Sequence, residues 1–183
     1  MKKWIAVFLS LCMLAACGSA FAETNASVEE QLAQIVQSAL DLEELAYEYD
    51  AENQSFSISF SLDCALGRSD VTIYLYDDMI SVAADCPLQF DSKSFEKVAV
   101  FTTLANNELY YAQFRVDREY GWITCHSCNV IESVLPTEEE VLTLLYAPLW
   151  AMEDYGNGLA SICTLGVDPH EAFESCQTSI ETA

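Results

Sequence analysis

Positive charge is scarce in this sequence of 183 residues, which has 7 lysines and arginines against 29 aspartates and glutamates. The formal net charge is −22 at pH 7. Proteins that bind a phosphate backbone depend on clustered Lys and Arg, so the composition argues against nucleic acid as a partner. The same shortage argues against peripheral binding to anionic lipid. The acidity favours solubility, and it also suits a cationic partner or divalent ions.

Signatures of catalysis are missing as well. The sequence has 2 histidines, and it contains no Gly-x-Ser-x-Gly elbow, phosphate-binding loop or dinucleotide fingerprint. The acidic segment "DAENQS" lacks the central glycine and the terminal glutamate of an EF-hand loop. Because the sequence offers no evident pair of residues for general acid and base catalysis, a hydrolase is disfavoured. We therefore expect a protein that is not an enzyme and needs no cofactor.

Long apolar runs are confined to the start of the chain, where residues 1–22 are predicted to be an export signal. Lys2 and Lys3 precede an apolar run over residues 4–16, which is shorter than the ~20 residues that cross a bilayer. Cleavage before Cys17 would leave this cysteine as a lipidated first residue, whereas cleavage after Ala22 would release a free periplasmic or secreted protein. We favour the membrane-anchored lipoprotein, because Leu-Ala-Ala-Cys directly ends the apolar run. A lipid on Cys17 is then the only contact with a membrane that we expect.

Hydrophobic periodicity predicts the first elements after the signal. Ser27 and Glu30 form a capping box that starts a helix. The alternation in "SFSISFSL" predicts a strand with one buried and one wet face, which forms a hairpin with the segment before it. A second hairpin follows in "VTIYLYDDMISVAA". If Asp77 and Asp78 are its turn residues, the apolar side chains pair on one face, whereas a slip of one residue would destroy the match.

The second half of the chain continues the alternation of helices and strands. Its predicted elements are a helix over residues 92–107, strands over 109–118 and 120–130, a long helix from Thr137 and a short helix from Pro169. Pro148 is expected to kink the long helix, and the glycines at 156 and 158 are expected to break it. The order α-β-β-β-β-α-β-β-α plus a short C-terminal helix is typical of an α+β fold, with an antiparallel sheet packed against helices.

Several segments resemble the YbjN-like family, whose fold is that of the small acidic type III secretion chaperones. They are "FSISFSL", "VTIYLYDDMISVAA", "LANNELYYAQFRVDREYGWI" and "APLWAMEDYGNGL". The helix that ends in Leu-Ala-Asn-Asn and leads at once to a strand with Phe114 and Asp117 is especially similar. The resemblance covers residues 27–160 and implies a compact sheet-and-helix domain that recognises other proteins, without a cofactor or known catalytic residues. Residues 161–183 are then a cysteine-containing C-terminal extension.

Six cysteines lie beyond the export signal, and in an exported domain such cysteines favour disulfides over catalytic thiols. Cys64 and Cys86 are expected to face inward at the same end of the sheet, so they are the favoured pair. Cys163 and Cys176 could staple the C-terminal extension, which would stabilise it by ~3 kcal/mol in the chain-entropy model. The disulfide candidates are Cys64, Cys86, Cys125, Cys128, Cys163 and Cys176.

The segment "CHSC" supports an alternative function, an envelope protein that handles thiol redox chemistry or metal ions with Cys125, His126 and Cys128. A redox Cys-x-x-Cys normally sits at a helix N-terminus, which stabilises the thiolate, but this segment continues a strand. In a regular strand Cys125 and Cys128 are ~10 Å apart on opposite faces, so they can pair only if the strand bulges or ends. Zinc would need a fourth ligand that no second motif supplies. His126 is better explained as a surface or packing histidine.

The favoured function is an exported, non-enzymatic YbjN-like domain that binds a protein or peptide at the cell envelope. The sequence is rich in aromatic residues, and those on the solvent side of the sheet could form a surface for a partner. Tyr74 and Tyr76 are the candidate contacts. Counting free thiols on the exported protein would separate this function from the thiol or metal alternative.

Overall fold

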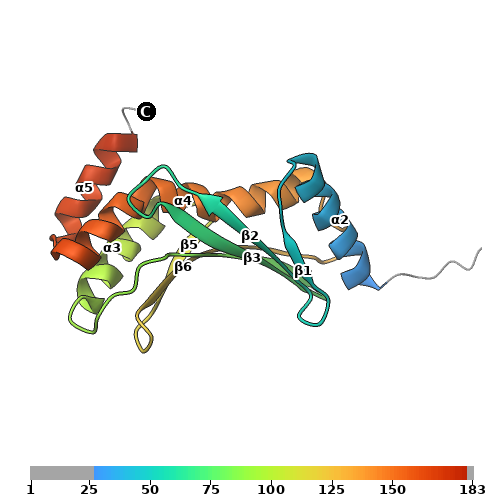
Figure 1. Cartoon of the computed structure of the whole chain (residues 1–183), viewed down its shortest axis with the longest axis horizontal. Helices are drawn as coiled ribbons and strands as arrows, with labels where there is room; N and C mark the ends of the chain where they lie inside the picture. Colours follow the sequence, from blue (N-terminus) through green and yellow to red (C-terminus); the bar gives the residue numbers. More distant parts are fainter. Residues whose placement is uncertain (1–26, 181–183) are drawn as a thin grey trace, which may run out of the picture.

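The computed structural model describes residues 27–180. Within this range the chain forms a six-stranded antiparallel sheet with four helices (Figure 1). The strand order is β1-β2-β3-β4-β6-β5, so β6 lies between β4 and β5. The fold class and the order of elements expected from the sequence are confirmed. In chain order the elements are α2 (Val28–Leu42), β1 (Glu48–Asp50), β2 (Ser55–Ser61), β3 (Arg68–Tyr76), β4 (Met79–Asp85), α3 (Phe95–Glu108), β5 (Gln113–Asp117), β6 (Trp122–Val130), α4 (Glu138–Leu165) and α5 (Pro169–Ile180).

Local sequence signals set the helix starts and the hairpin register. The Ser27 hydroxyl accepts a hydrogen bond from the Glu30 N–H at 3.1 Å, and the Glu30 carboxylate accepts one from the Ser27 N–H at 3.0 Å. Thr137 begins α4 with the same reciprocal pair. In the β3–β4 hairpin Tyr76 pairs with Met79, as predicted. The apolar pairs that follow are Leu75–Ile80, Ile73–Val82 and Val71–Ala84.

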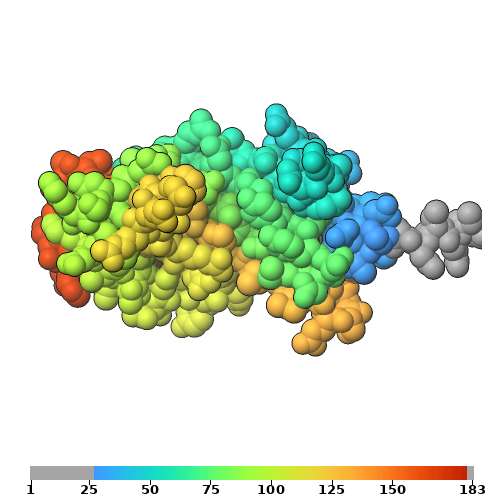
Figure 2. Space-filling model, turned by 90° about the horizontal axis from the view of Figure 1, so that it is seen from below, coloured from blue at the N-terminus to red at the C-terminus, as the bar shows by residue number. Residues whose placement is uncertain are grey.

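The helices cover one face of the sheet and leave the other to solvent. α4 packs across β3, β4 and β6, α2 packs on β3 and on α4, and α3 lies against β5. Along β3, Ile73 is fully buried while its neighbour Tyr74 is exposed, because successive side chains point to opposite faces. Figure 2 looks onto the molecule from below, where green and yellow segments fill most of the surface. We call the uncovered side, which carries Thr72, Tyr74 and Tyr76 of β3, the open face.

The long helix α4 passes through the glycines that were expected to break it. A Cβ atom at Gly156 would lie 2.6 Å from Cys64 Sγ, and one at Gly158 would lie 2.4 Å from Cζ of Phe101. The two glycines therefore allow close packing against α4 and do not end it. The helix ends at Gly166, whose φ of 69° is a left-handed conformation that favours glycine at this position.

The C-terminal extension shares the core of the domain. The boundary expected at residue 160 falls inside α4, and α5 packs on both α4 and α3. Tyr155 of α4 stacks on Phe173 of α5 with 6.0 Å between ring centroids. Gln177 donates a hydrogen bond to the Tyr155 hydroxyl at 3.1 Å. Residues 161–180 thus complete the layer of helices over one end of the sheet.

Strand β5 is shorter than the sequence suggested, because α3 continues to Glu108 and the chain then needs residues 109–112 to return to the sheet. Asn106 of α3 holds the returning chain. Its side-chain carbonyl accepts from the Phe114 N–H at 2.7 Å, and its amide donates to the Phe114 carbonyl at 3.0 Å. These bonds occupy the outward peptide groups of β5 at Phe114.

Candidate functional site: the free edge of strand β2

Strand β1 covers only part of β2. The pairing of the two strands runs from Asp50 opposite Ser55 to Glu48 opposite Ser57, and it stops there. β1 begins at Glu48, and the chain before it leaves β2 and leads back to the end of α2 (Figure 1). Residues 58–61 of β2 are therefore paired with β3 on one side, and no strand of residues 27–180 pairs with them on the other.

The outward peptide groups of this segment belong to Ser59 and Ser61. The Leu62 N–H donates to Gly67 at 3.0 Å, and the Leu75 N–H donates to Gln54 at 2.9 Å, so the even-numbered residues of β2 bond to β3. Antiparallel ladders alternate, which directs the N–H and C=O groups of Ser59 and Ser61 to the unpaired side. Both serines are exposed. An exposed row of such groups is a template for another strand.

The loop after β2 is fastened to α4, which holds the free edge in place. The Asp63 N–H donates to the Glu153 carboxylate at 3.2 Å. The Ala65 N–H donates to the Asn157 side chain at 2.8 Å. The edge thus lies between two fixed points, the β1 pairing at one end and the α4 anchor at the other.

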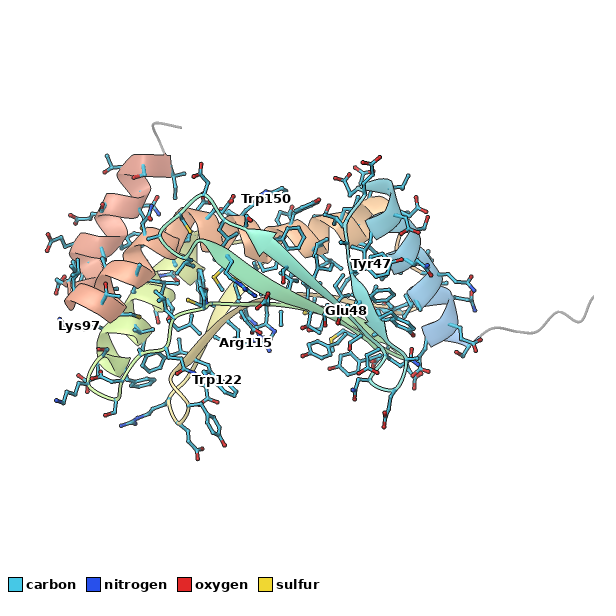
Figure 3. The ribbon with its side chains drawn as sticks, viewed as in Figure 1. Tyr47, Glu48, Lys97, Arg115, Trp122 and Trp150 are labelled. Atoms are coloured by element: carbon cyan, nitrogen blue, oxygen red, sulfur yellow. The ribbon has the colours of Figure 1, made fainter. Side chains whose placement is uncertain are left out.

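Aromatic side chains flank the free edge on the helix side of the sheet. Phe60 of β2 lies edge-on to Tyr146 of α4 with 6.3 Å between centroids, and Tyr146 stacks with Trp150 at 6.0 Å. Trp150 is 57% exposed and projects from α4 near β2 (Figure 3). The Tyr146 hydroxyl donates to Glu43 at 3.3 Å, and burial together with this carboxylate raises the pKa of Tyr146. We call Phe60, Tyr146 and Trp150 the aromatic shelf.

A cavity lies where β1 and β2 separate. Its volume is about 540 Å³, and it is lined by residues 46–48 on one side and by residues of β2 and β3 on the other. Glu48 and Tyr47 stand at its β1 side (Figure 3). The cavity gives an added chain room to enter beside Ser59.

The charge on the open side of this edge is mainly negative. Asp70 accepts from the Ser59 hydroxyl at 2.6 Å and from Arg68 at 2.7 Å, and these bonds hold the pKa of Asp70 below its ordinary value. Asp85 lies directly opposite Asp70 on β4. Burial, with a contribution from the Asp70 carboxylate, raises the pKa of Asp85. Glu48 lies opposite Ser57 on β1.

Tyr74 and Tyr76, the contacts predicted from the sequence, lie on the open face away from this edge. They are 37% and 46% exposed. Tyr74 is opposite Ser55 of β2 and Ser81 of β4, and Ser81 is in turn opposite Cys128 of β6. The two tyrosines thus belong to the part of the sheet near the hairpin turns, and the aromatic shelf is a separate surface.

The "CHSC" segment does not converge on one site. β6 is regular through this segment, so Cys125 points into the core between Ala84 and Phe114, whereas His126 and Cys128 lie on the open face. One metal ion cannot be shared across the sheet. Burial raises the pKa of Cys125 to about 12, the opposite of the lowered pKa of a redox thiol. Among residues 27–180 no group of three His, Cys, Asp or Glu side chains is placed to hold a metal.

His126, which is expected to be a surface or packing histidine, lies half-buried on the open face. One of its ring nitrogens lies 2.8 Å from the Thr124 hydroxyl. Burial lowers the pKa of His126, and the charge of Arg115 lowers it further. Both effects favour the neutral form of the imidazole.

The six cysteines of the described range are free thiols in the structure, and the favoured Cys64–Cys86 pair is not bonded. Cys64 faces α4 with its sulfur 3.6 Å from the Met152 carbonyl. Cys163 and Cys176 lie within α4 and α5 and do not flank a simple loop. The disulfides therefore stay predictions. Cys17 and its proposed lipid lie outside the described residues.

The free edge of β2 was not identified from the sequence. The alternating serines predict a wet sheet face, but this pattern does not show whether their peptide groups are paired. One available signal is that this strand contains no lysine or proline, the residues that commonly protect an exposed edge. The extent of β1, which decides how much of β2 is covered, has no comparable sequence marker.

Fold and site together define an α+β domain in which helices cover one sheet face and part of β2 has no second partner strand among residues 27–180. This is the type III secretion chaperone-like fold expected from the resemblance. The chain is similar to a chain of the crystal structure of the ExsC–ExsE complex, with a TM-score of 0.51 and 15% identity, covering 70% of this chain and 93% of that one. It is also similar to the crystal structure of YbjN from E. coli, with a TM-score of 0.49 and 12% identity, covering 68% and 90%. No protein-family model and no curated protein matches the sequence.

Within residues 27–180, no helix has the length and apolar character needed to cross a membrane.

Proposed function

We propose that this protein is an exported, non-enzymatic domain that binds an extended segment of another protein at the cell envelope. The segment would add as a strand to the free edge of β2. The observation that carries this proposal is the unpaired stretch at Ser59 and Ser61 with the aromatic shelf beside it. The chain of similar fold in the ExsC–ExsE crystal structure is part of a protein–protein complex.

The edge and the aromatic shelf have different energetic roles. Ser59 and Ser61 provide two outward N–H and two outward C=O groups, and each new hydrogen bond contributes about 0.5–1.5 kcal/mol net. Association costs about 4 kcal/mol or more in lost freedom, so the main-chain bonds alone give no useful affinity. An apolar side chain that is buried on Tyr146 and Trp150 adds about 1.5–3 kcal/mol. Binding therefore requires both features together.

The envelope location rests on the sequence of residues 1–22. The proposed tether is a lipid on Cys17, because the apolar run ends at the Leu-Ala-Ala-Cys segment. The intact mass of the exported N-terminus tests it, and a Cys17→Ala variant is expected to be free of the membrane. Cleavage after Ala22 in the unmodified protein would refute the tether, but it would leave the binding domain unchanged.

A proline at Ser59 tests strand addition. Proline removes the outward N–H of Ser59 without breaking a bond to β3, a position where edge strands tolerate it. Ser59→Ala is the matched control, since it keeps the N–H and removes only the hydroxyl. Crosslinking pull-down from envelope extracts is expected to enrich a partner with the parent protein and with Ser59→Ala, and to lose it with Ser59→Pro. Equal recovery with a folded Ser59→Pro protein, checked by circular dichroism, would overturn the proposal.

A further inference from the structure

Resting on the strand addition proposed above, we infer that the bound segment is cationic, with lysine or arginine alternating with apolar residues. The inference comes from the two unlike surfaces that meet at the free edge of β2.

Alternation along an added strand presents its side chains to those two surfaces in turn. A residue directly opposite Ser59 shares its side of the sheet and projects onto the open face. The residues before and after it project to the helix side, where the aromatic shelf lies. The shelf is apolar, and Trp150 at 57% exposure leaves much of it uncovered. Every second residue of the segment is thus matched to an apolar surface.

The open side of the edge favours positive charge. Glu48 stands on the β1 flank, and Asp70 and Asp85 follow Ser59 on the next two strands. Arg68 already bonds both carboxylate oxygens of Asp70 at 2.7 Å, and the next cation on this face, Arg115 of β5, lies two strands beyond Asp85. Three carboxylates against one guanidinium leave a negative surplus beside the added strand. Because Ser59 is small, a lysine or arginine opposite it can extend over the hydroxyl toward Asp70.

Apart from Arg68, the elements around the site carry no cation. The sequence has no Lys or Arg from residue 4 to 67 or after Arg118, so α2, β1 and α4 carry none. Four of the five cations beyond residue 22 occur between residues 93 and 118. Lys97 there donates to the Gly166 carbonyl, and Arg118 lies over the Phe95 ring at 4.9 Å. Figure 3 shows Lys97 on the α3 side of the molecule, away from Glu48.

The fluorescence of Trp150 provides a direct measurement. The sequence has 3 tryptophans, of which one lies in the predicted export signal. In the exported Trp122→Phe protein, Trp150 is therefore the remaining indole. We propose titration with three capped seven-residue peptides in which valine alternates with lysine, serine or glutamate, and with a lysine peptide whose backbone nitrogens are methylated. Glu48→Gln tests the charge at the site, and Glu52→Gln, in the β1–β2 turn, is the matched control.

We expect the lysine peptide to bind at least tenfold more tightly than the glutamate peptide, since each exposed charge pair contributes about a two- to fivefold change. Its affinity should fall as salt is raised from about 0.05 to 0.5 M. Glu48→Gln should weaken it more than Glu52→Gln. If the serine peptide binds as well as the lysine peptide and the methylated peptide does not bind, the charge inference is overturned while strand addition stands. If the methylated peptide binds as well as its parent, or if no peptide binds, strand addition fails and the inference fails with it.

Discussion

A methyl group at Gly158 would test the packing of α4 directly. Its Cβ would lie 2.4 and 2.5 Å from two ring carbons of Phe101 and 2.9 Å from Cys176 Sγ. The Phe101 ring is fully buried. Tyr155 and Phe173 hold it edge-on at 6.2 and 6.5 Å between centroids. The ring therefore cannot turn aside to admit the methyl group.

Two effects of Gly158→Ala oppose each other. Alanine is the better helix former by about 1 kcal/mol. Forcing a methyl group into a filled core costs about 1–3 kcal/mol, and occasionally more. Because the overlap is with a fixed ring and not with the end of a flexible chain, we expect the cost to exceed the gain. The free energy of unfolding should fall by about 1–2 kcal/mol, which lowers the Tm of a domain of this size by about 2–8 °C.

Urea unfolding followed by circular dichroism measures this change, because a shift in midpoint at constant slope is a change in stability. Thr143→Ala is the control, since Thr143 is exposed on the same helix. It should gain a few tenths of a kcal/mol from helix propensity. A Gly158→Ala protein that is more stable than the parent, beside a control that behaves as expected, would refute the assignment of Gly158 to close packing.

Three further predictions concern the aromatic shelf, Asp85 and the cysteines of β6. Trp150→Ala should weaken partner binding in the pull-down at least tenfold. Trp122→Ala is the control and should not weaken it, although it removes an equally large indole that is 51% exposed on β6. Equal losses would contradict the role of the aromatic shelf. Asp85→Asn should stabilise the protein at pH 7, because the raised pKa of Asp85 means that its ionised form costs folding free energy. This gain should shrink as pH falls through that raised pKa and vanish below the ordinary value near 3.8, so a difference constant with pH would count against it. Alkylation of the native protein should label exposed Cys128, and Cys125 should react only after unfolding. Early labelling of Cys125 would contradict its placement in the core.

The parts of the fold that follow from neighbouring residues could be predicted from the sequence. The hairpin register could be derived because Asp77 and Asp78 can serve as the turn in one alignment that places apolar residues on one face. The helix start at Ser27 depends on two residues three positions apart. The opposite faces of Cys125 and Cys128 follow from the period of a strand, so the sequence alone argues against a site shared by the two thiols.

What could not be predicted depends on contacts between distant segments. From local propensity, Gly156 is expected to break the helix. In the structure Cys64 packs closely against it, so contacts with another part of the chain outweigh the local propensity. The free edge of β2 depends on where β1 leaves the sheet, and three exposed residues do not mark that point in the sequence. The aromatic shelf joins Phe60 to Tyr146, which are far apart in the chain. The sequence shows that these aromatic residues are present, but it does not show that they lie together.

The side-chain amide of Asn106 makes the two margins of the sheet differ in their capacity to add a strand. A sheet with two open margins can recruit strands at both and extend from molecule to molecule into a fibre. Here the margin at Phe114 is already occupied by an amide of the same chain. The stretch at Ser59 is at the other margin, and it is short and bounded at both ends. A segment that adds here is limited to the length of this stretch, so we expect the domain to bind one short segment at it.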